Sequence, residues 1–118
     1  LGGKGANIIF DDANLDEAIP TAVRAAFRNQ GQICLAGSRL FVHQKVYDQV
    51  VERLVQRVKT IKVGDPLDPN TQMGALVSRE HLDKVLSYIE IGKKEGQLLT
   101  GGEPIGAQLG SQFKNGYF

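Results

Sequence analysis

The sequence contains one cysteine, no tryptophan and almost equal numbers of positive and negative charges. Lys and Arg number 14 and Asp and Glu number 13 among 118 residues, so the formal net charge is +1. So small a charge gives no electrostatic reason to expect nucleic acid or an anionic membrane surface as a partner. Long apolar runs are also absent, and none approaches the roughly 18 residues that a membrane-spanning helix needs.

The single cysteine limits the chemistry that the chain can carry. It cannot form a disulfide within the chain, and it cannot build a cysteine-cluster metal site, so we expect no metal ligands. Small secreted domains commonly rely on several disulfides, so we expect a reducing, cytoplasmic location.

Composition and chain ends suggest part of a larger α/β protein. With 42% apolar and 23% charged residues, the composition is that of a globular α/β or α+β protein. Leu1 enters a Gly-Gly turn at once, and the terminal residues GYF (116–118) predict a strand that does not continue. We therefore expect residues 1–118 to be a segment that is truncated at both ends.

Strand and helix patterns alternate along the sequence. Apolar and β-branched residues predict a buried strand over 6–10, a second strand over 38–43 and a short one over 97–100. Helical periodicity predicts helices over 15–29, 45–60 and 79–95, and residues 101–116 are a glycine-rich loop. This order predicts right-handed crossovers and a mostly parallel sheet with flanking helices.

Short polar residues and glycines mark the ends of these helices. Asn14, followed by Glu17, fits a capping box at the start of the first helix, and Ser78 fits a cap of the third. Gly31 can end the first helix in a left-handed conformation, and Gly96 is expected at the end of the third.

Cys34 lies in the stretch NQGQICLAGS (29–38), between a predicted helix and a predicted strand. Cysteine is often a small buried apolar residue, which is one interpretation. The other is a nucleophile, because glycines on both sides allow a substrate to approach and loops carry the sites of α/β proteins. A nucleophilic thiol needs a base or a positive setting, and neither His43 nor His81 is placed to supply one.

Three functional classes follow from these residues. Cys34 could serve an enzyme, or a thiol-redox or acyl-transfer protein, or the chain could be a non-catalytic assembly module whose sheet edges pair with other chains. The GGKG stretch (2–5) lacks the spacing of a phosphate loop and precedes a strand, so we interpret it as a backbone turn.

Several stretches of the sequence resemble the aldehyde dehydrogenase superfamily. FRNQGQICLAGS (27–38) resembles the family's active-site cysteine signature, and LGGK (1–4) resembles its Glu-Leu-Gly-Gly-Lys motif without the glutamate. SRLFV, VGDPLDPNTQMGALVS and GYF follow in the family's order and spacing. The resemblance covers the whole chain and implies a fragment of the family's α/β catalytic domain.

The resemblance also implies a function and a set of site residues. Family members oxidise an aldehyde to a carboxylic acid with NAD or NADP, and their chains form homo-oligomers. Cys34 would attack the aldehyde, form a thiohemiacetal and then a thioester, and use its own backbone N–H in the oxyanion hole. By the same match, the backbone of Leu1 and Gly2 would border the nicotinamide. The substrate tunnel would be lined by Arg28, Ile33 and Leu35.

The resemblance also indicates which functional parts of the family this sequence does not contain. The family's general base, oxyanion asparagine and nucleotide-binding domain lie outside this sequence, so we expect the isolated segment to be inactive. DANLDEAIPTAVRAAF (12–27) and GQICL (31–35) are most similar to the dehydrogenases of muconic semialdehydes.

Overall fold

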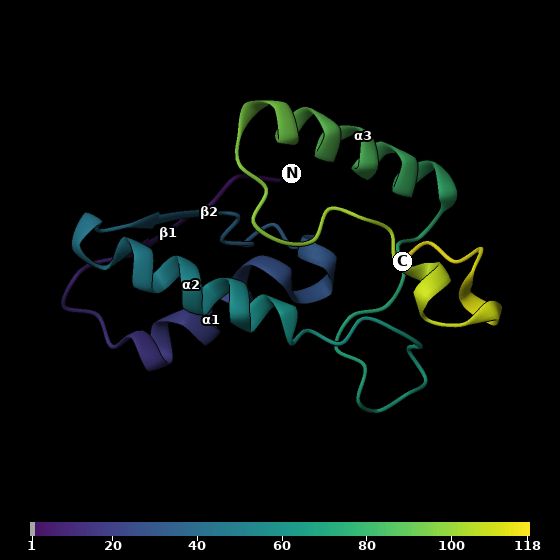
Figure 1. Cartoon of the computed structure of the whole chain (residues 1–118), viewed down its shortest axis with the longest axis horizontal. Coiled ribbons are helices and arrows are strands. Elements are labelled where there is room, and N and C mark those ends of the chain that lie inside the picture. The colour runs from purple at the N-terminus through teal and green to yellow at the C-terminus, as the bar shows by residue number, and fades with distance from the viewer. Residues whose placement is uncertain (1) are drawn as a thin grey trace. The chain divides into compact units, whose positions relative to one another are not determined.

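A computed structural model describes residues 2–118 and divides the chain into two compact units, with the boundary after Ile61 in the sequence (Figure 1). Two strands and two α-helices belong to the first unit, and one α-helix belongs to the second. In chain order they are β1 (Ala6–Ile9), α1 (Leu15–Phe27), β2 (Arg39–Val42), α2 (Tyr47–Lys59) and α3 (Arg79–Glu95).

The first unit is built on a parallel strand pair. β1 pairs with β2 in a register that sets Ile8 beside Phe41 and Ile9 beside Val42, and α1 makes the crossover between the strands. The prediction of an α/β fold with a parallel sheet and flanking helices is therefore confirmed.

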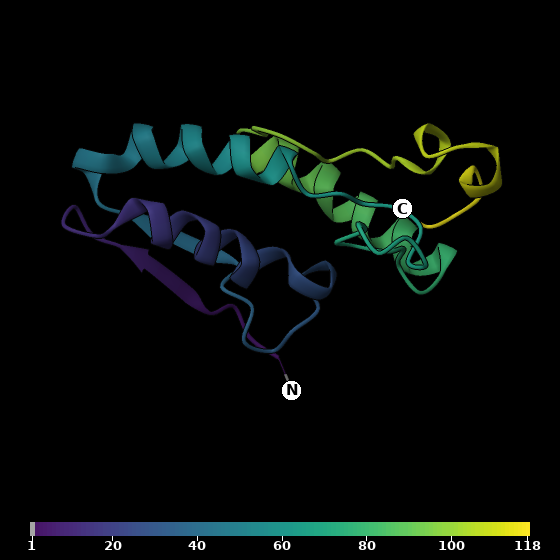
Figure 2. The ribbon, with the colours of Figure 1, turned by 90° about the horizontal axis from the view of Figure 1, so that it is seen from below.

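Both helices of this unit pack on one face of the strand pair. Ile9, Ile19, Ala22 and Val50 form a buried cluster, and α1 and α2 lie side by side over it (Figure 2). Partly buried residues complete this core, among them Leu15, Leu40, Val42 and Leu54.

The opposite face of the strand pair carries exposed apolar side chains. Ile8 is 59% exposed, Phe10 60% and Phe41 51%, so the prediction that residues 6–10 form a buried strand is wrong for every second residue. Side chains alternate between the two faces of a strand. Within the described part of the first unit, residues 2–61, helices cover only one of those faces.

The ends of α1 differ slightly from their prediction. The side chain of Asn14 accepts a hydrogen bond from the backbone N–H of Asp16 (3.1 Å), so Asn14 caps the helix, with a different donor from the one that a capping box uses. The helix ends at Phe27 instead of Asn29, because Asn29 and Gln30 already have left-handed backbone angles.

Ion pairs join α1 and the loop before it to α2 and to the 3₁₀ turn (Gln44–Val46) that precedes α2. Lys45 Nζ lies 2.8 Å from Asp11 Oδ2, and Arg53 pairs with Asp16. The hydrogen bond from Lys45 holds the pKa of Asp11 below its usual value. Both pairs are solvent-exposed, so each contributes little to stability.

The second unit contains the third predicted helix at its predicted bounds. Ser78 Oγ accepts the backbone N–H of His81 (3.1 Å) at the start of α3, and Leu82 is buried. Gly96 ends the helix in an extended conformation, and its N–H donates to the carbonyl oxygen of Gly92 (2.8 Å).

Two predicted strands do not form. Residues 97–100 and 116–118 are irregular, and 101–116 hold two short 3₁₀ turns. A strand needs a neighbour to pair with, and the described part of the second unit offers none. The C-terminal residues are held by separate backbone bonds instead, from Leu76 N–H to Tyr117 O (2.8 Å) and from Ile105 N–H to Phe118 O (3.1 Å).

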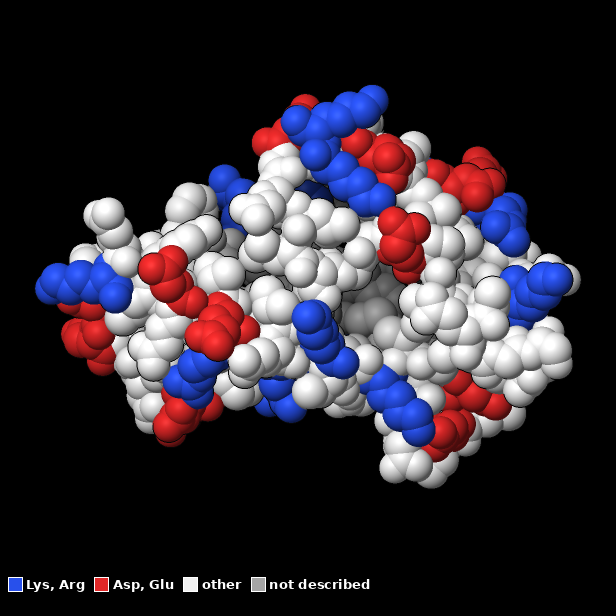
Figure 3. Space-filling model, in the orientation of Figure 1, with Lys and Arg blue, Asp and Glu red and all other residues white. Residues whose placement is uncertain are grey.

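The described surface mixes charges of both signs. On the face in Figure 3, acidic and basic side chains are interspersed, without a broad area of one sign. None of the described helices is both long and apolar enough to cross a membrane.

Candidate active site

The Cys34 loop lies at the amino ends of the two parallel strands. A crossover helix runs opposite to its strands, so the C-terminal end of α1 arrives at this same edge. There it meets the Cys34 loop, which precedes β2, and the GGKG segment, which precedes β1 (Figure 2). Ligands of open α/β sheets usually bind at the carboxyl ends of the strands, so this candidate site departs from that rule.

Three consecutive left-handed residues lead from α1 into the loop. Asn29 has φ 53°, Gln30 has φ 55° and Gly31 has φ 72°. The predicted left-handed Gly31 is confirmed. Left-handed backbone is unfavourable for residues other than glycine, and such residues concentrate at functional sites.

Cys34 occupies a tight turn. The N–H of Ala36 donates to the carbonyl oxygen of Ile33 (2.9 Å), which places Cys34 and Leu35 at the two central positions. Cys34 is exposed, so the interpretation as a buried apolar residue is wrong for this structure. Among the residues that the structure describes, none accepts a hydrogen bond from the Cys34 backbone N–H.

Close backbone contacts fix both sides of this turn. Its far side is tied to α1 by a bond from Gly37 N–H to Ala25 O (3.2 Å). On the other side lies the GGKG segment: a Cβ atom at Gly3 would be 3.9 Å from Cys34 O, and one at Gly5 would be 3.3 Å from Ala36 O. The structure therefore places this glycine-rich segment beside the cysteine.

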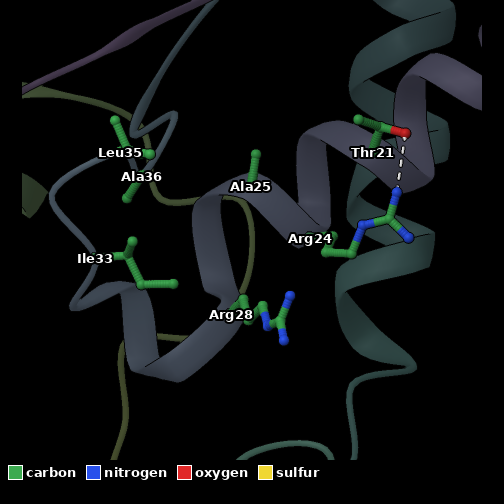
Figure 4. A pocket seen from close by; sticks show the side chains of 7 residues that line it. All are labelled: Thr21, Arg24, Ala25, Arg28, Ile33, Leu35 and Ala36. Carbon is green, nitrogen blue, oxygen red and sulfur yellow. Dashed lines mark hydrogen bonds between the residues drawn. The ribbon is translucent and has the colours of Figure 1, made fainter.

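A pocket of about 230 Å³ opens next to the turn, and three residues predicted to bind substrate line it together. They are Arg28 at the end of α1 and Ile33 and Leu35, the two neighbours of Cys34 (Figure 4). Leu35 is 86% exposed and Ile33 37% exposed, so the pocket has an apolar and accessible wall. Their role in binding stays a prediction.

Two further polar residues of the pocket were not identified from the sequence. Arg24 and Thr21 also line it, and Arg24 Nη2 donates to Thr21 Oγ1 at 3.3 Å (Figure 4). The sequence could have indicated Arg24, because it lies four residues before Arg28 and this spacing places both residues on one helix face.

Leu1 and Gly2 were predicted to border the nicotinamide, and the structure describes only Gly2. Leu1 lies outside the described residues. Gly2 is exposed, and a Cβ atom there would meet nothing within 4 Å, so the space beside it is open.

Other chemistry-bearing side chains lie away from Cys34 in their own local contacts. His43 follows β2, at the opposite end of that strand, where its Nδ1 accepts the N–H of Lys45 (3.3 Å). Over residues 2–118, no group of three His, Cys, Asp or Glu side chains could hold a metal ion.

Known proteins match the chain along its whole length. A model of the Aldehyde dehydrogenase family matches residues 1–118. The chain belongs to the aldehyde dehydrogenase family. It is 50% identical over its full length to betaine aldehyde dehydrogenase of Brucella anthropi, and 47% identical to 2-aminomuconic semialdehyde dehydrogenase of Bos taurus. In both cases it covers 24% of the relative's length.

Solved structures of the family share the fold of the chain. A betaine aldehyde dehydrogenase point mutant from Staphylococcus aureus, in complex with NAD⁺ and with a BME-modified cysteine, matches with a TM-score of 0.90 and 40% identity. All of this chain and 24% of that one are covered. The chain thus spans about a quarter of the length of the relatives it matches. Because these include betaine aldehyde and muconic semialdehyde dehydrogenases, the predicted subgroup stays a prediction.

Proposed function

We propose that this chain supplies the nucleophilic cysteine of an NAD(P)-dependent aldehyde dehydrogenase, and that Cys34 is that cysteine. Membership of the family supports the reaction class. The observation that carries the residue assignment is the exposed turn at Cys34, whose two neighbours line a pocket and whose backbone N–H has no acceptor among the described residues.

The first step is addition of the Cys34 thiolate, which the last step of the cycle regenerates, to the aldehyde. Cys34 Sγ, as the thiolate, forms a bond to the carbonyl carbon, and the carbonyl π electrons move to oxygen, giving a thiohemiacetal oxyanion. The Cys34 N–H lies in the same residue as the new bond and donates to that oxygen. One preorganised donor of this kind typically stabilises the transition state by about 3 kcal/mol.

The second step is oxidation at the same carbon. The thiohemiacetal carbon loses a hydride and its oxygen reforms a carbonyl, which leaves a thioester on Cys34. The chemistry that NAD(P) supplies when bound is acceptance of that hydride. Gly2 and Gly3 fit a flat ring nearby, because Gly2 borders open space and Gly3 lies against Cys34 O without a side chain between them.

Hydrolysis completes the cycle. Water adds to the thioester carbonyl, Cys34 leaves as the thiolate, and the product is a carboxylic acid. A general base must take the proton from that water. The resemblance locates this base, a glutamate, outside the 118 residues, together with the nucleotide-binding domain.

The chain is, in this proposal, a segment of the catalytic domain of a cytoplasmic homo-oligomeric enzyme. Its quarter-length match to the relatives supports the proposal that it is a segment of a longer enzyme. So do the exposed apolar side chains of Ile8, Phe10 and Phe41, because a contiguous apolar surface commonly marks a place where another element packs. The substrate is a small aldehyde, as for the betaine aldehyde and 2-aminomuconic semialdehyde relatives.

The experiment is replacement of Cys34 by Ala in the full-length enzyme that contains this chain. We expect aldehyde oxidation, followed as reduced nicotinamide, to be abolished while NAD binding measured by calorimetry is retained. Acid quenching of the unmodified enzyme during turnover, followed by digestion and mass spectrometry, should find the acyl group on the peptide with Cys34. Retention of more than a few per cent of kcat, a loss under about 2 kcal/mol in the barrier, would exclude Cys34 as the nucleophile.

A further inference from the structure

Building on the proposed function, we propose that Arg24 and Arg28 form one subsite for a carboxylate at the far end of the substrate. The enzyme would then act on aldehydes that carry a carboxylate at the end remote from the reacting carbon. Arg24 has no assigned role in the resemblance, and the subsite depends on both residues.

The geometry joins the two arginines to the cysteine turn. Arg24 lies in the last turn of α1 and Arg28 is its C-terminal cap, four residues later, so their side chains leave the helix on one side (Figure 4). Both line the same pocket as Ile33 and Leu35, which flank Cys34 in the chain. Cys34 itself does not line the pocket, so the proposal requires a substrate whose aldehyde is at Cys34 to run past Ile33 and Leu35 and to place its other end at the guanidinium groups.

The electrostatics of the pocket favour an anion. The ion pairs found among the described residues involve Lys45, Arg53, Lys62 and Lys93, and neither Arg24 nor Arg28 has an acidic partner there. Two like charges four residues apart on a helix repel each other, and a carboxylate between them relieves that repulsion.

The donor geometry favours a carboxylate in particular. A guanidinium has five N–H donors in a planar fork, which matches the two oxygens of a carboxylate. The bond from Arg24 to Thr21 uses one Nη2 donor and holds the side chain on the pocket side, which leaves other donors for a ligand. The helix dipole explains why cations are favourable at this end of α1. It does not explain why Arg24 and Arg28 line one pocket beside the cysteine turn.

The test uses the full-length enzyme that contains this chain and two matched sets of substrates. The carboxylated set is the semialdehydes of succinate, glutarate and adipate, and the neutral set is butanal, pentanal and hexanal. Arg24→Met and Arg28→Met remove each charge and keep an extended apolar side chain. We expect each to lower kcat/KM for the carboxylated set by roughly tenfold or more relative to its effect on kcat/KM for the neutral set.

Arg57→Met is the control variant. Arg57 lies in the last turn of α2 and donates to Thr60 Oγ1 at 3.4 Å, as Arg24 does to Thr21, but it does not line this pocket. This variant should leave kcat/KM unchanged for both substrate sets. Arg28→Lys keeps the charge without the fork, so its loss on the carboxylated set should be smaller than that of Arg28→Met, and it covers the case in which the Met variant fails to fold.

Four outcomes would overturn the subsite: equal losses on both sets, no loss on either, a wild-type enzyme that prefers neutral aldehydes, or an effect confined to KM for NAD(P). The last outcome would mean that the arginines bind a cofactor phosphate. Failure of the wild-type enzyme to oxidise any aldehyde would contradict the proposed function itself. Activity on butanal therefore separates the two failures.

Discussion

The backbone N–H of Gly37 donates to the carbonyl oxygen of Ala25 at 3.2 Å, and this bond ties the Cys34 turn to the last turn of α1. A Cβ atom at position 37 would lie 3.3 Å from Asn7 Cβ and 3.5 Å from Ala25 Cβ. The turn is thus packed so closely between β1 and α1 that a side chain at position 37 would push its neighbours apart. Its position relative to both elements depends on Gly37.

Gly37→Val should therefore displace Cys34 from its place. Overpacking of this kind typically costs 1–3 kcal/mol in stability, and a displacement of about 1 Å at a reacting group can lower a rate by about a hundredfold. We expect kcat of the full-length enzyme to fall by roughly tenfold or more, measured on a neutral aldehyde. The matched control is Gly92→Ala in α3, where a Cβ would meet nothing within 4 Å, and which should leave kcat unchanged. A Gly37→Val enzyme with full kcat would show that the turn is not held by this contact.

Substitutions at Gly31 test whether the left-handed backbone before the turn limits stability. Its φ of 72° is unfavourable for other residues, and a Cβ there would also lie 3.1 Å from Ala26 O. Gly31→Ala should destabilise the loop by about 1 kcal/mol or more, while Gly31→Asn should cost less, because asparagine tolerates left-handed backbone. Thermal melting of the full-length variants should rank wild type highest, Asn next and Ala lowest. The opposite order of Asn and Ala would argue against backbone strain as the cause.

Local signals in the sequence were sufficient to predict the helices and the two strands of the parallel pair. Ser78 predicted the start of α3 through its side-chain cap, and the apolar stripe around Leu82 gave its length. These signals depend on residues within one or two turns of each other. The end of α1 was misjudged because the left-handed conformation of Asn29 and Gln30 is not encoded by glycine, the usual marker of such a position.

Pairing and pocket formation depend on distant residues and were predicted less well. Leu98 and Leu99 have the composition of a strand, but no described neighbour pairs with them, and each is 48% exposed. The residues themselves made Cys34 a candidate nucleophile, and the resemblance added Arg28, Ile33 and Leu35. Arg24 entered the candidate site only because it lines the same pocket. A single sequence shows which residues share a helix face, but not which loop returns to meet that face.

The isolated 118-residue chain should neither bind NAD tightly nor oxidise aldehydes. In our proposal Gly2 and Gly3 only border a flat ring. The resemblance locates the nucleotide-binding domain and the general base outside these 118 residues. Calorimetric titration of the chain with NAD should show no saturable binding in the micromolar range. A clear isotherm would mean that these residues contain more of a cofactor site than we propose.

Asp68 in the second unit gives a pH-dependent prediction that is independent of the active site. Lys62 Nζ lies 2.8 Å from Asp68 Oδ2, and the backbone and side-chain N–H groups of Asn70 donate to Oδ1 at 2.8 and 3.0 Å. The hydrogen bond from Lys62, followed by those from Asn70, lowers the pKa of Asp68 from 3.8 to about 2. Because the folded pKa is the lower one, these bonds stabilise the loop fully above about pH 4 and are lost as the pH falls toward 2.

Replacing Lys62 by Met should raise the pKa of Asp68 toward its usual value. In protein labelled with ¹³C at aspartate, the Asp68 carboxyl of the wild type should stay ionised at about pH 3, whereas that of Lys62→Met should already be partly protonated there. Lys45→Met is the control, because Lys45 pairs with Asp11 and not with Asp68. It should raise the pKa of Asp11 and leave the titration of Asp68 unchanged. Identical Asp68 titrations in wild type and Lys62→Met would show that Asn70, and not the ammonium group, sets the pKa.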